Sequence, residues 1–234
     1  MEYSRPAHPG APPIWLEGRE KYIRGPVSDF GGFDNIPVDL WFGKRDGNFD
    51  TTHLRIASDY FIGLPLWHGE HAPLNIVWPS MRSIDEEIEI RNKNGMSDTR
   101  LNIFRMTLSE SDLSFSGTDR AGSRPVGKCS PMVSDTQRGV IYCNEPSNNP
   151  SEKRYIQYWP LDENIRTPFY KNPPRFKCYI VEEPEKKRFE HCFGYFSYNA
   201  DFQILIDTHE ELAIAMLNDF PRLIEFLHTL EVTP

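Results

Sequence analysis

Four cysteines offer the clearest chemistry in this sequence of 234 residues. Cys129 and Cys143 are separated by the same number of positions as Cys178 and Cys192. Four cysteines allow three disulfide pairings, and free buried thiols or a zinc site are the alternatives. A structural zinc site normally brings two cysteines within a few residues of each other, and that close spacing is absent. We therefore expect one disulfide within each equally spaced pair.

The sequence around each pair is typical of a β-hairpin. Residues 176–181 resemble a strand, residues 182–187 are polar and contain a proline, and residues 188–198 resemble the returning strand. A hairpin that turns in the middle of 182–187 brings the two cysteines of that pair opposite each other, within disulfide reach. The same reasoning applies to the first pair, with its turn at 134–139.

The expected disulfides also indicate where the protein works. Disulfides in a chain of this size imply an oxidising compartment. The sequence has no acceptor motif for N-glycosylation, which favours a bacterial periplasm over a eukaryotic secretory route. Residues 1–13 are polar and proline-rich, without the apolar core of a signal peptide. We expect a mature periplasmic protein that has lost its signal or lipid-anchor segment, with residues 1–13 as a flexible tether; a cytoplasmic protein is the alternative.

Composition argues against a nucleic-acid partner and against a transmembrane helix. The net charge is −8, so the chain has no general attraction for phosphate, and we expect no nucleic-acid partner. No stretch approaches the roughly 18 apolar residues that a transmembrane helix needs. Aromatic residues make up 13% of the chain, which is typical of a folded protein with a substantial core.

The order of elements predicts an α+β fold with antiparallel sheets, disulfide-bridged hairpins and a C-terminal amphipathic helix packed on the sheet. Residues 14–117 contain short strands and turns and form a β-rich first half. Residues 118–234 form a second half with both hairpins and the helix, and the two halves could be one domain.

The C-terminal helix has clear start and face signals. Thr208 and Glu211 are spaced as a capping box at its beginning. Pro221 predicts a kink, or two short helices that meet just before it. The apolar residues that recur at helical spacing and should form the buried face are Leu212, Met216, Phe220, Leu223, Leu227 and Leu230.

Motifs for catalysis are missing from the sequence. There is no nucleophile elbow and no glycine-rich nucleotide loop. His68 and His71 flank Glu70, so they could bind a metal, but neighbouring glycine and prolines favour a solvated loop. We expect no cofactor and no enzymatic activity.

Two other groups of residues could bind a partner. Asp85, Glu86, Glu87 and Glu89 lack the order of a calcium loop and are typical of a solvated helix start, although they could also face a basic partner. In the strand that follows residue 152, alternation makes Tyr158 the outward aromatic residue and a possible interface anchor.

The last third of the chain has a distinctive order of elements: Cys178, a polar turn, Cys192 followed by Phe-Gly-Tyr-Phe, the strand 202–206 and a capped helix that ends with residues 222–227. In this order it resembles the C-terminal part of periplasmic immunity proteins of type VI secretion systems. Residues 52–56 and 74–79 are similar to the N-terminal strands of that family. The resemblance implies a non-enzymatic protein, often lipid-anchored, that blocks the active site of a cognate toxin such as a phospholipase or another lipase-type effector.

An inhibitor of this class needs loops or charged segments that meet the toxin. We take the segment from Asp85 to Glu89 and the loop of residues 144–152, with Asn148 and Asn149, as candidate interface residues. Two other functions stay open: an envelope or secreted enzyme without a recognisable motif, and a structural or substrate-binding periplasmic protein.

Overall fold

The computed structural model describes residues 37–42, 52–61, 72–96, 100–110, 129, 131–145, 154–183, 186–200 and 202–232. It divides the chain into two compact units. The first comprises Met1–Ser111, Ala200–Phe202 and Ile224–Pro234, and the second comprises Asp112–Asn199 and Gln203–Leu223.

Some of the predicted site residues lie outside the described part of the chain. These are His68 and His71, which could have bound a metal, and Asn148 and Asn149, which were interface candidates.

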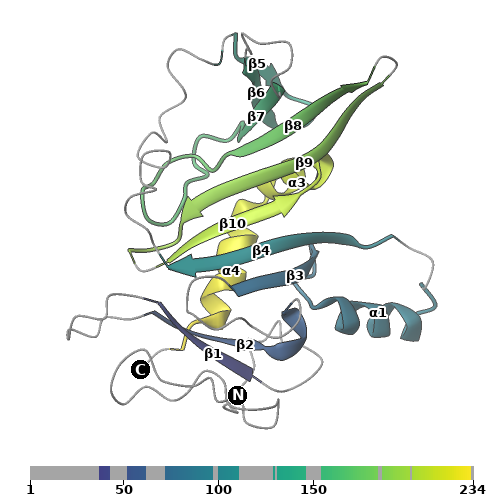
Figure 1. The fold of residues 1–234 in the computed structure, drawn as a ribbon, viewed down its shortest axis with the longest axis vertical. Helices are drawn as coiled ribbons and strands as arrows, with labels where there is room; N and C mark the ends of the chain where they lie inside the picture. The colour runs from purple at the N-terminus through teal and green to yellow at the C-terminus, as the bar shows by residue number, and fades with distance from the viewer. Residues whose placement is uncertain are drawn as a thin grey trace. The chain divides into compact units, whose positions relative to one another are not determined.

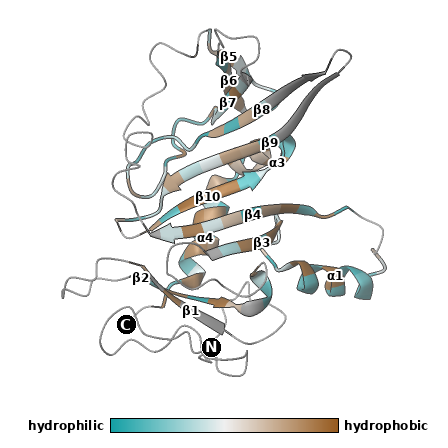
Figure 2. Cartoon of the chain, in the orientation of Figure 1, coloured by the Kyte–Doolittle hydropathy of each residue, from teal (hydrophilic) through white to brown (hydrophobic). Residues whose placement is uncertain are grey.

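Two antiparallel strand pairs form the described part of the first unit (Figure 1). The pairs are β1 (Pro37–Phe42) with β2 (Thr52–Ala57), and β3 (Ala72–Trp78) with β4 (Asn102–Glu110). A short 3-10 helix, η2 (Ser58–Tyr60), follows β2, and α1 (Ile84–Lys93) precedes β4. Figure 2 shows both hydrophilic and hydrophobic residues on α1, as expected for a helix at a surface.

The second unit is built on an antiparallel sheet in the strand order β10-β9-β8-β7-β6-β5. Its elements are β5 (Val133–Asp135), β6 (Val140–Glu145), β7 (Arg154–Pro160), β8 (Phe176–Glu183), β9 (Lys186–Ser197), β10 (Phe202–Thr208) and α3 (Glu210–Asn218). The last helix, α4 (Phe220–Leu230), begins in the second unit, and its residues from Ile224 onward belong to the first. Antiparallel sheets with C-terminal helices confirm the predicted α+β class.

Both predicted disulfides are present. Cys178 and Cys192 are direct partners across β8 and β9, as the hairpin argument required, and their Cα atoms are 3.9 Å apart. The argument was wrong in one detail of the first pair. Cys129 precedes β5 and has no strand partner there, because β5 pairs with β6 only from Val133 onward; the disulfide ties Cys129, which lies outside the strands, to Cys143 of β6.

The two disulfides lie on opposite faces of this sheet. Cross-strand partners in an antiparallel sheet point to the same face, whereas neighbours along a strand point to opposite faces. Cys143 is opposite Gln157, which is opposite Lys177. Since Lys177 and Cys178 are neighbours on β8, the Cys178–Cys192 bridge is on the other side. We call the side with Cys178 the inner face and the side with Lys177 the outer face.

The helices contact the inner face. The Phe196 ring on β9 packs edge-on against Phe220 at the start of α4, with ring centroids 4.9 Å apart. Gly194 leaves room for the Phe176 ring, because a Cβ atom at Gly194 would lie only 2.8 Å from Phe176 Cε1. Alternate residues of β10 (Phe202, Ile204 and Ile206) are fully buried.

The C-terminal region contains two helices, as Pro221 predicted, and every apolar position of the predicted helical face is buried. The predicted cap was wrong by one residue. Thr208 is the last residue of β10, and His209 is the N-cap of α3: its Nδ1 accepts a hydrogen bond from the Leu212 N–H at 3.4 Å. Strand pairing with Cys192 holds Thr208 in the sheet and so moves the start of the helix.

Tyr158 is not an outward residue, contrary to the sequence prediction. Its side chain is 2% exposed and lies on the inner face, where it meets Glu210 of α3. The next residue, Trp159, is 3% exposed on the outer face, where it packs in a cluster with Cys129 and Cys143. Alternation failed here because this end of β7 is covered on both faces, so neither set of side chains reaches solvent.

Candidate interaction face

The outer face of the second unit carries a continuous set of aromatic and charged side chains from β6 to β10. Most of them are half-buried, with one side against the sheet and the other exposed. They are Glu145, Tyr155, Gln157, Lys177, Tyr179, His191, Phe193, Tyr195, Gln203, Leu205 and Asp207.

The middle of the outer face is organised around Tyr155. The Lys177 ammonium group lies over its ring, 4.0 Å from the centroid, and pairs with the Glu145 carboxylate at 2.6 Å. The Tyr179 ring is 5.8 Å from that of Tyr155, and the Phe193 ring meets it edge-on at 6.5 Å. Each contact is worth a few tenths of a kcal/mol to about 1 kcal/mol at a surface. Together they hold the side chains in defined positions.

A second set of contacts extends this network across β9 and β10. His191 Nδ1 is 3.0 Å from an oxygen of Asp207, and the side chains are 46% and 36% exposed, respectively. The His191 ring also packs against Phe193, with centroids 6.2 Å apart. Beside them the Tyr195 hydroxyl donates a hydrogen bond to Gln203 Oε1. Leu205 adds an aliphatic side chain that is 38% exposed.

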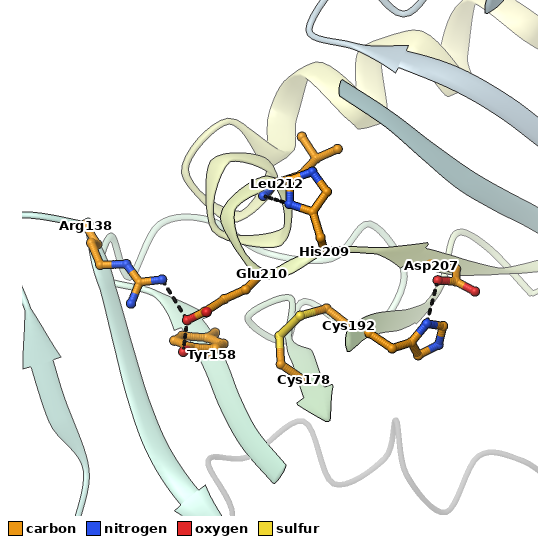
Figure 3. The surroundings of a disulfide bond; sticks show 9 residues. Arg138, Tyr158, Cys178, Cys192, Asp207, His209, Glu210 and Leu212 are labelled. Carbon is orange, nitrogen blue, oxygen red and sulfur yellow. Dashed lines mark hydrogen bonds and ion pairs between the residues drawn. A yellow bond between two sulfur atoms is a disulfide. The ribbon is translucent and has the colours of Figure 1, made fainter. Parts of the chain in front are cut away.

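On the inner face, an ion-paired carboxylate fixes the start of α3 to the sheet. Glu210 accepts hydrogen bonds from the Tyr158 hydroxyl and from Arg138 Nη2, the latter at 2.8 Å (Figure 3). Burial, and then the hydrogen bond and charge of Glu210, raise the pKa of the Tyr158 hydroxyl well above its usual value. Partial burial opposes the charge of Arg138, but Glu210 outweighs it and raises the pKa of the guanidinium. The Tyr158 hydroxyl therefore stays neutral and the Arg138 guanidinium stays charged near neutral pH, and the role of this contact is structural.

The acidic segment lies on α1 in the first unit, where the sequence predicted a helix start. Ser83 is the N-cap, and its Oγ accepts a hydrogen bond from the Glu86 N–H at 3.2 Å. Asp85 is exposed, whereas the Glu87 side chain is 9% exposed. The carboxylate of Glu87 binds Arg91 Nε at 2.7 Å.

Most of the negative charge of this segment is paired locally. Glu86 and Glu87 lie 3.6 Å and 3.3 Å from the Arg82 guanidinium, and Glu89 pairs with Lys93. Burial raises the pKa of Glu86. Burial also acts to raise the pKa of Glu87, but hydrogen bonds from Arg91, Ser80 and Arg82 outweigh it and lower that pKa. The acidic segment therefore offers a basic partner less charge than its sequence suggests, and its role in binding stays a prediction.

The structure thus brings together a set of side chains that the sequence interpretation did not single out. Tyr155, Tyr179 and Phe193 come from three different strands, so no local sequence motif identifies them as a group. A signal was present nonetheless, because Lys177 and Tyr179 on β8, and His191 and Phe193 on β9, alternate with the two disulfide cysteines. Amphipathic residues at this spacing indicate a sheet face that is neither core nor fully solvated.

Two findings concern metals and membranes. Within the described residues, no group of three or more His, Cys, Asp or Glu side chains is placed to hold a metal ion. None of the described helices is long and apolar enough to cross a bilayer.

Comparison with known proteins yields one partial structural likeness. No model of a known protein family matches the chain, and no curated protein matches it either. A solved structure described as an immunity protein of the Stenotrophomonas maltophilia type IV secretion system is similar over 84% of this chain and 94% of that chain. The sequences are 14% identical and the TM-score is 0.49.

Proposed function

We propose that this protein is an immunity protein: it binds a cognate toxin of a bacterial secretion system and neutralises it. The observation that carries the proposal is the outer face of the second unit. Its tyrosines and histidine are amphipathic, its phenylalanine is apolar, and all of them are at least partly exposed. Charged neighbours hold Tyr155 and His191 in place. Aromatic side chains of this kind supply most of the binding energy in protein interfaces.

The rigidity of this face suits an inhibitor. Association costs free energy for every side chain that must be ordered, at about 0.5–1.5 kcal/mol each. On the outer face, Lys177, Tyr155 and His191 are already held by specific partners before any toxin arrives. One disulfide lies on each face of the supporting sheet, and each stabilises the folded scaffold because it restricts the unfolded chain.

The finer parts of the proposal follow from the sequence resemblance and from the disulfides. Two disulfides are compatible with an oxidising compartment, and we place the protein in the bacterial periplasm. The resemblance implies a type VI secretion effector of the phospholipase or lipase type, inhibited by occlusion of its active site. It also implies a precursor that carries a lipid anchor.

The test uses the purified chain and the purified product of the toxin gene that neighbours its own gene. Calorimetry should give a nanomolar dissociation constant, and the toxin's hydrolysis of phospholipid vesicles should stop at equimolar immunity protein. Absence of binding to the correctly identified neighbour would refute the immunity function. Binding without inhibition would refute occlusion of the active site and leave the partnership in place.

A pair of variants tests the outer face itself. Tyr179→Ala removes a ring from the aromatic network, whereas Val133→Ala truncates an apolar side chain, 40% exposed, on β5 in the same unit. We expect Tyr179→Ala to weaken binding at least tenfold and Val133→Ala to change it less than twofold. Equal affinities for both variants would show that the toxin binds elsewhere.

A further inference from the structure

The loop between β7 and β8, residues 161–175, presents two aromatic rings side by side. Phe169 and Tyr170 meet edge-on, with their ring centroids 4.7 Å apart and their planes at 70°. The Phe169 side chain is 40% exposed although it is fully apolar. Loop tips in water are normally polar, whereas this turn holds an exposed phenylalanine against a half-buried tyrosine and so offers apolar surface to a partner.

The turn that carries these rings is rigid. The Thr167 N–H donates to the Asn172 carbonyl at 2.7 Å, and the Lys171 N–H donates to the Thr167 carbonyl at 3.2 Å, so hydrogen bonds close the turn on both sides of the rings. Thr167 is only 5% exposed, which anchors one end in the unit. Lys171 has φ of 58°, a left-handed conformation that reverses the chain directly after Tyr170.

Prolines restrict the same segment. Pro168 enters the turn, and Pro173 and Pro174 leave it. Each proline fixes its own φ and limits the residue before it. The unbound loop therefore already has little conformational freedom to lose when a partner binds.

Both ends of the loop are attached to the second unit. The Leu161 N–H donates to the Gly139 carbonyl at 2.9 Å, and Asp162 Oδ1 accepts from the Asn164 N–H at 2.8 Å. At the other end Arg175 Nη1 donates to Gln157 Oε1 at 3.4 Å, and Gln157 belongs to the outer face. The C-terminal end of the loop is thus hydrogen-bonded to a residue of the face to which the proposed function assigns toxin binding.

We propose that the aromatic turn, Phe169 and Tyr170, inserts into an apolar pocket of the toxin and acts as the anchor of the complex. This inference rests on the proposed function and deepens it. The chemistry selects the pocket: one flat hydrocarbon ring needs an apolar slot, and the neighbouring phenol needs a polar group near the rim. A rigid aromatic side chain that fills such a pocket is typical of an interface hot spot. A protein partner is favoured over an anionic membrane surface because the chain carries a net charge of −8.

The experiment measures the affinity of the purified neighbour-encoded toxin for three purified proteins: wild type, the double variant Phe169→Ala/Tyr170→Ala, and Arg166→Ala. Arg166 is exposed in the same loop and serves as the matched control. We expect the double variant to raise Kd at least tenfold, which corresponds to 1.4 kcal/mol, with an unchanged melting temperature and Arg166→Ala within twofold of wild type. Equal affinity of the double variant and the wild type would overturn the inference. The proposed function would then still stand, because it fails only when the wild type itself does not bind.

Two further measurements protect the test against a folding defect and against the membrane alternative. The emission of the new tryptophan in Phe169→Trp is obtained by subtraction of the wild-type emission spectrum. If the side chain inserts into an apolar pocket, this emission should shift to shorter wavelength when toxin is added. An unchanged emission wavelength would contradict insertion. Flotation with vesicles of phosphatidylglycerol and phosphatidylethanolamine tests the other source of apolar contact. Flotation that depends on Phe169 and Tyr170, with unchanged toxin affinity, would replace the toxin pocket with a lipid surface.

Discussion

The disulfide that joins Cys178 and Cys192 should contribute as much to stability as the one that joins Cys129 and Cys143. Each links residues 14 positions apart, and both lie in the second unit. In the chain-entropy model, a closed loop of about 15 residues stabilises the folded state by about 3 kcal/mol, because the cross-link restricts the unfolded chain. All four cysteine side chains are at most 3% exposed, so the loss of packing on replacement by alanine should also be similar.

The perturbation is the replacement of each pair by alanine, as Cys178→Ala/Cys192→Ala and as Cys129→Ala/Cys143→Ala. Replacement of both members avoids an unpaired thiol. A loss of about 3 kcal/mol is a large share of the roughly 5–15 kcal/mol by which such proteins are stable. We expect both variants to unfold at clearly lower denaturant concentration than the wild type.

The assay is urea unfolding followed by circular dichroism, with the free energy taken from linear extrapolation. Denatured wild type without reductant should show no titratable thiols, and each variant should also show none. A third variant replaces all four cysteines by alanine. Reductant should lower the unfolding free energy of the wild type to that of this variant, and it should leave the unfolding free energy of the variant itself unchanged.

Two results would refute this reasoning. A loss below about 1 kcal/mol in both variants would mean that the unfolded chain is already compact in these segments. A difference of more than about 2 kcal/mol between the variants would show that native packing around one bridge, and not loop closure, dominates its contribution.

Three other substitutions follow from the packing and the charges. Leu223→Ala removes a fully buried side chain and should cost about 2–5 kcal/mol in urea unfolding, whereas the exposed Glu225→Ala on the same helix should stay within about 0.5 kcal/mol. Gly194→Ala places a Cβ atom 2.8 Å from the Phe176 ring and should cost about 1–3 kcal/mol by overpacking; an unchanged midpoint would contradict the close contact. The pKa of Glu87 is lowered from 4.5 in the folded state, so its carboxylate stabilises the fold above pH 4.5, and this stabilisation is lost as the pH falls. The difference in unfolding free energy between wild type and Glu87→Gln should therefore narrow below pH 4.5. A difference that does not change with pH would contradict the contacts of Glu87 with Arg91 and Arg82.

The features predicted correctly from sequence are those that depend on local spacing. The Cys178–Cys192 pairing followed from the midpoint of one turn, and strand register then placed the two residues opposite each other. The apolar positions from Leu212 to Leu230 followed from helical periodicity, and all of them are buried. Pro221 separated the two helices because its missing N–H and fixed φ act on its own turn.

The features that sequence misjudged depend on what covers a residue from a distance. Tyr158 alternates like an outward residue, but α3 covers it, and its hydroxyl donates a hydrogen bond to Glu210, which is distant in the sequence. Thr208 has the spacing of a cap, but its pairing with Cys192 keeps it in the sheet and passes the cap to His209. In both cases a long-range contact competes with a local preference of about 1 kcal/mol and prevails.

The sequence by itself determined the disulfide pairing, the α+β class and the buried helix face, because these need only the period of a strand, a turn or a helix. The tertiary structure alone decided that the two disulfides lie on opposite faces and that Tyr155, Tyr179 and Phe193 meet on one of them. Register across several strands sets which side chains share a face, and a shift of one residue would send each to the other side. For that reason the candidate interaction face is a property of the assembled sheet.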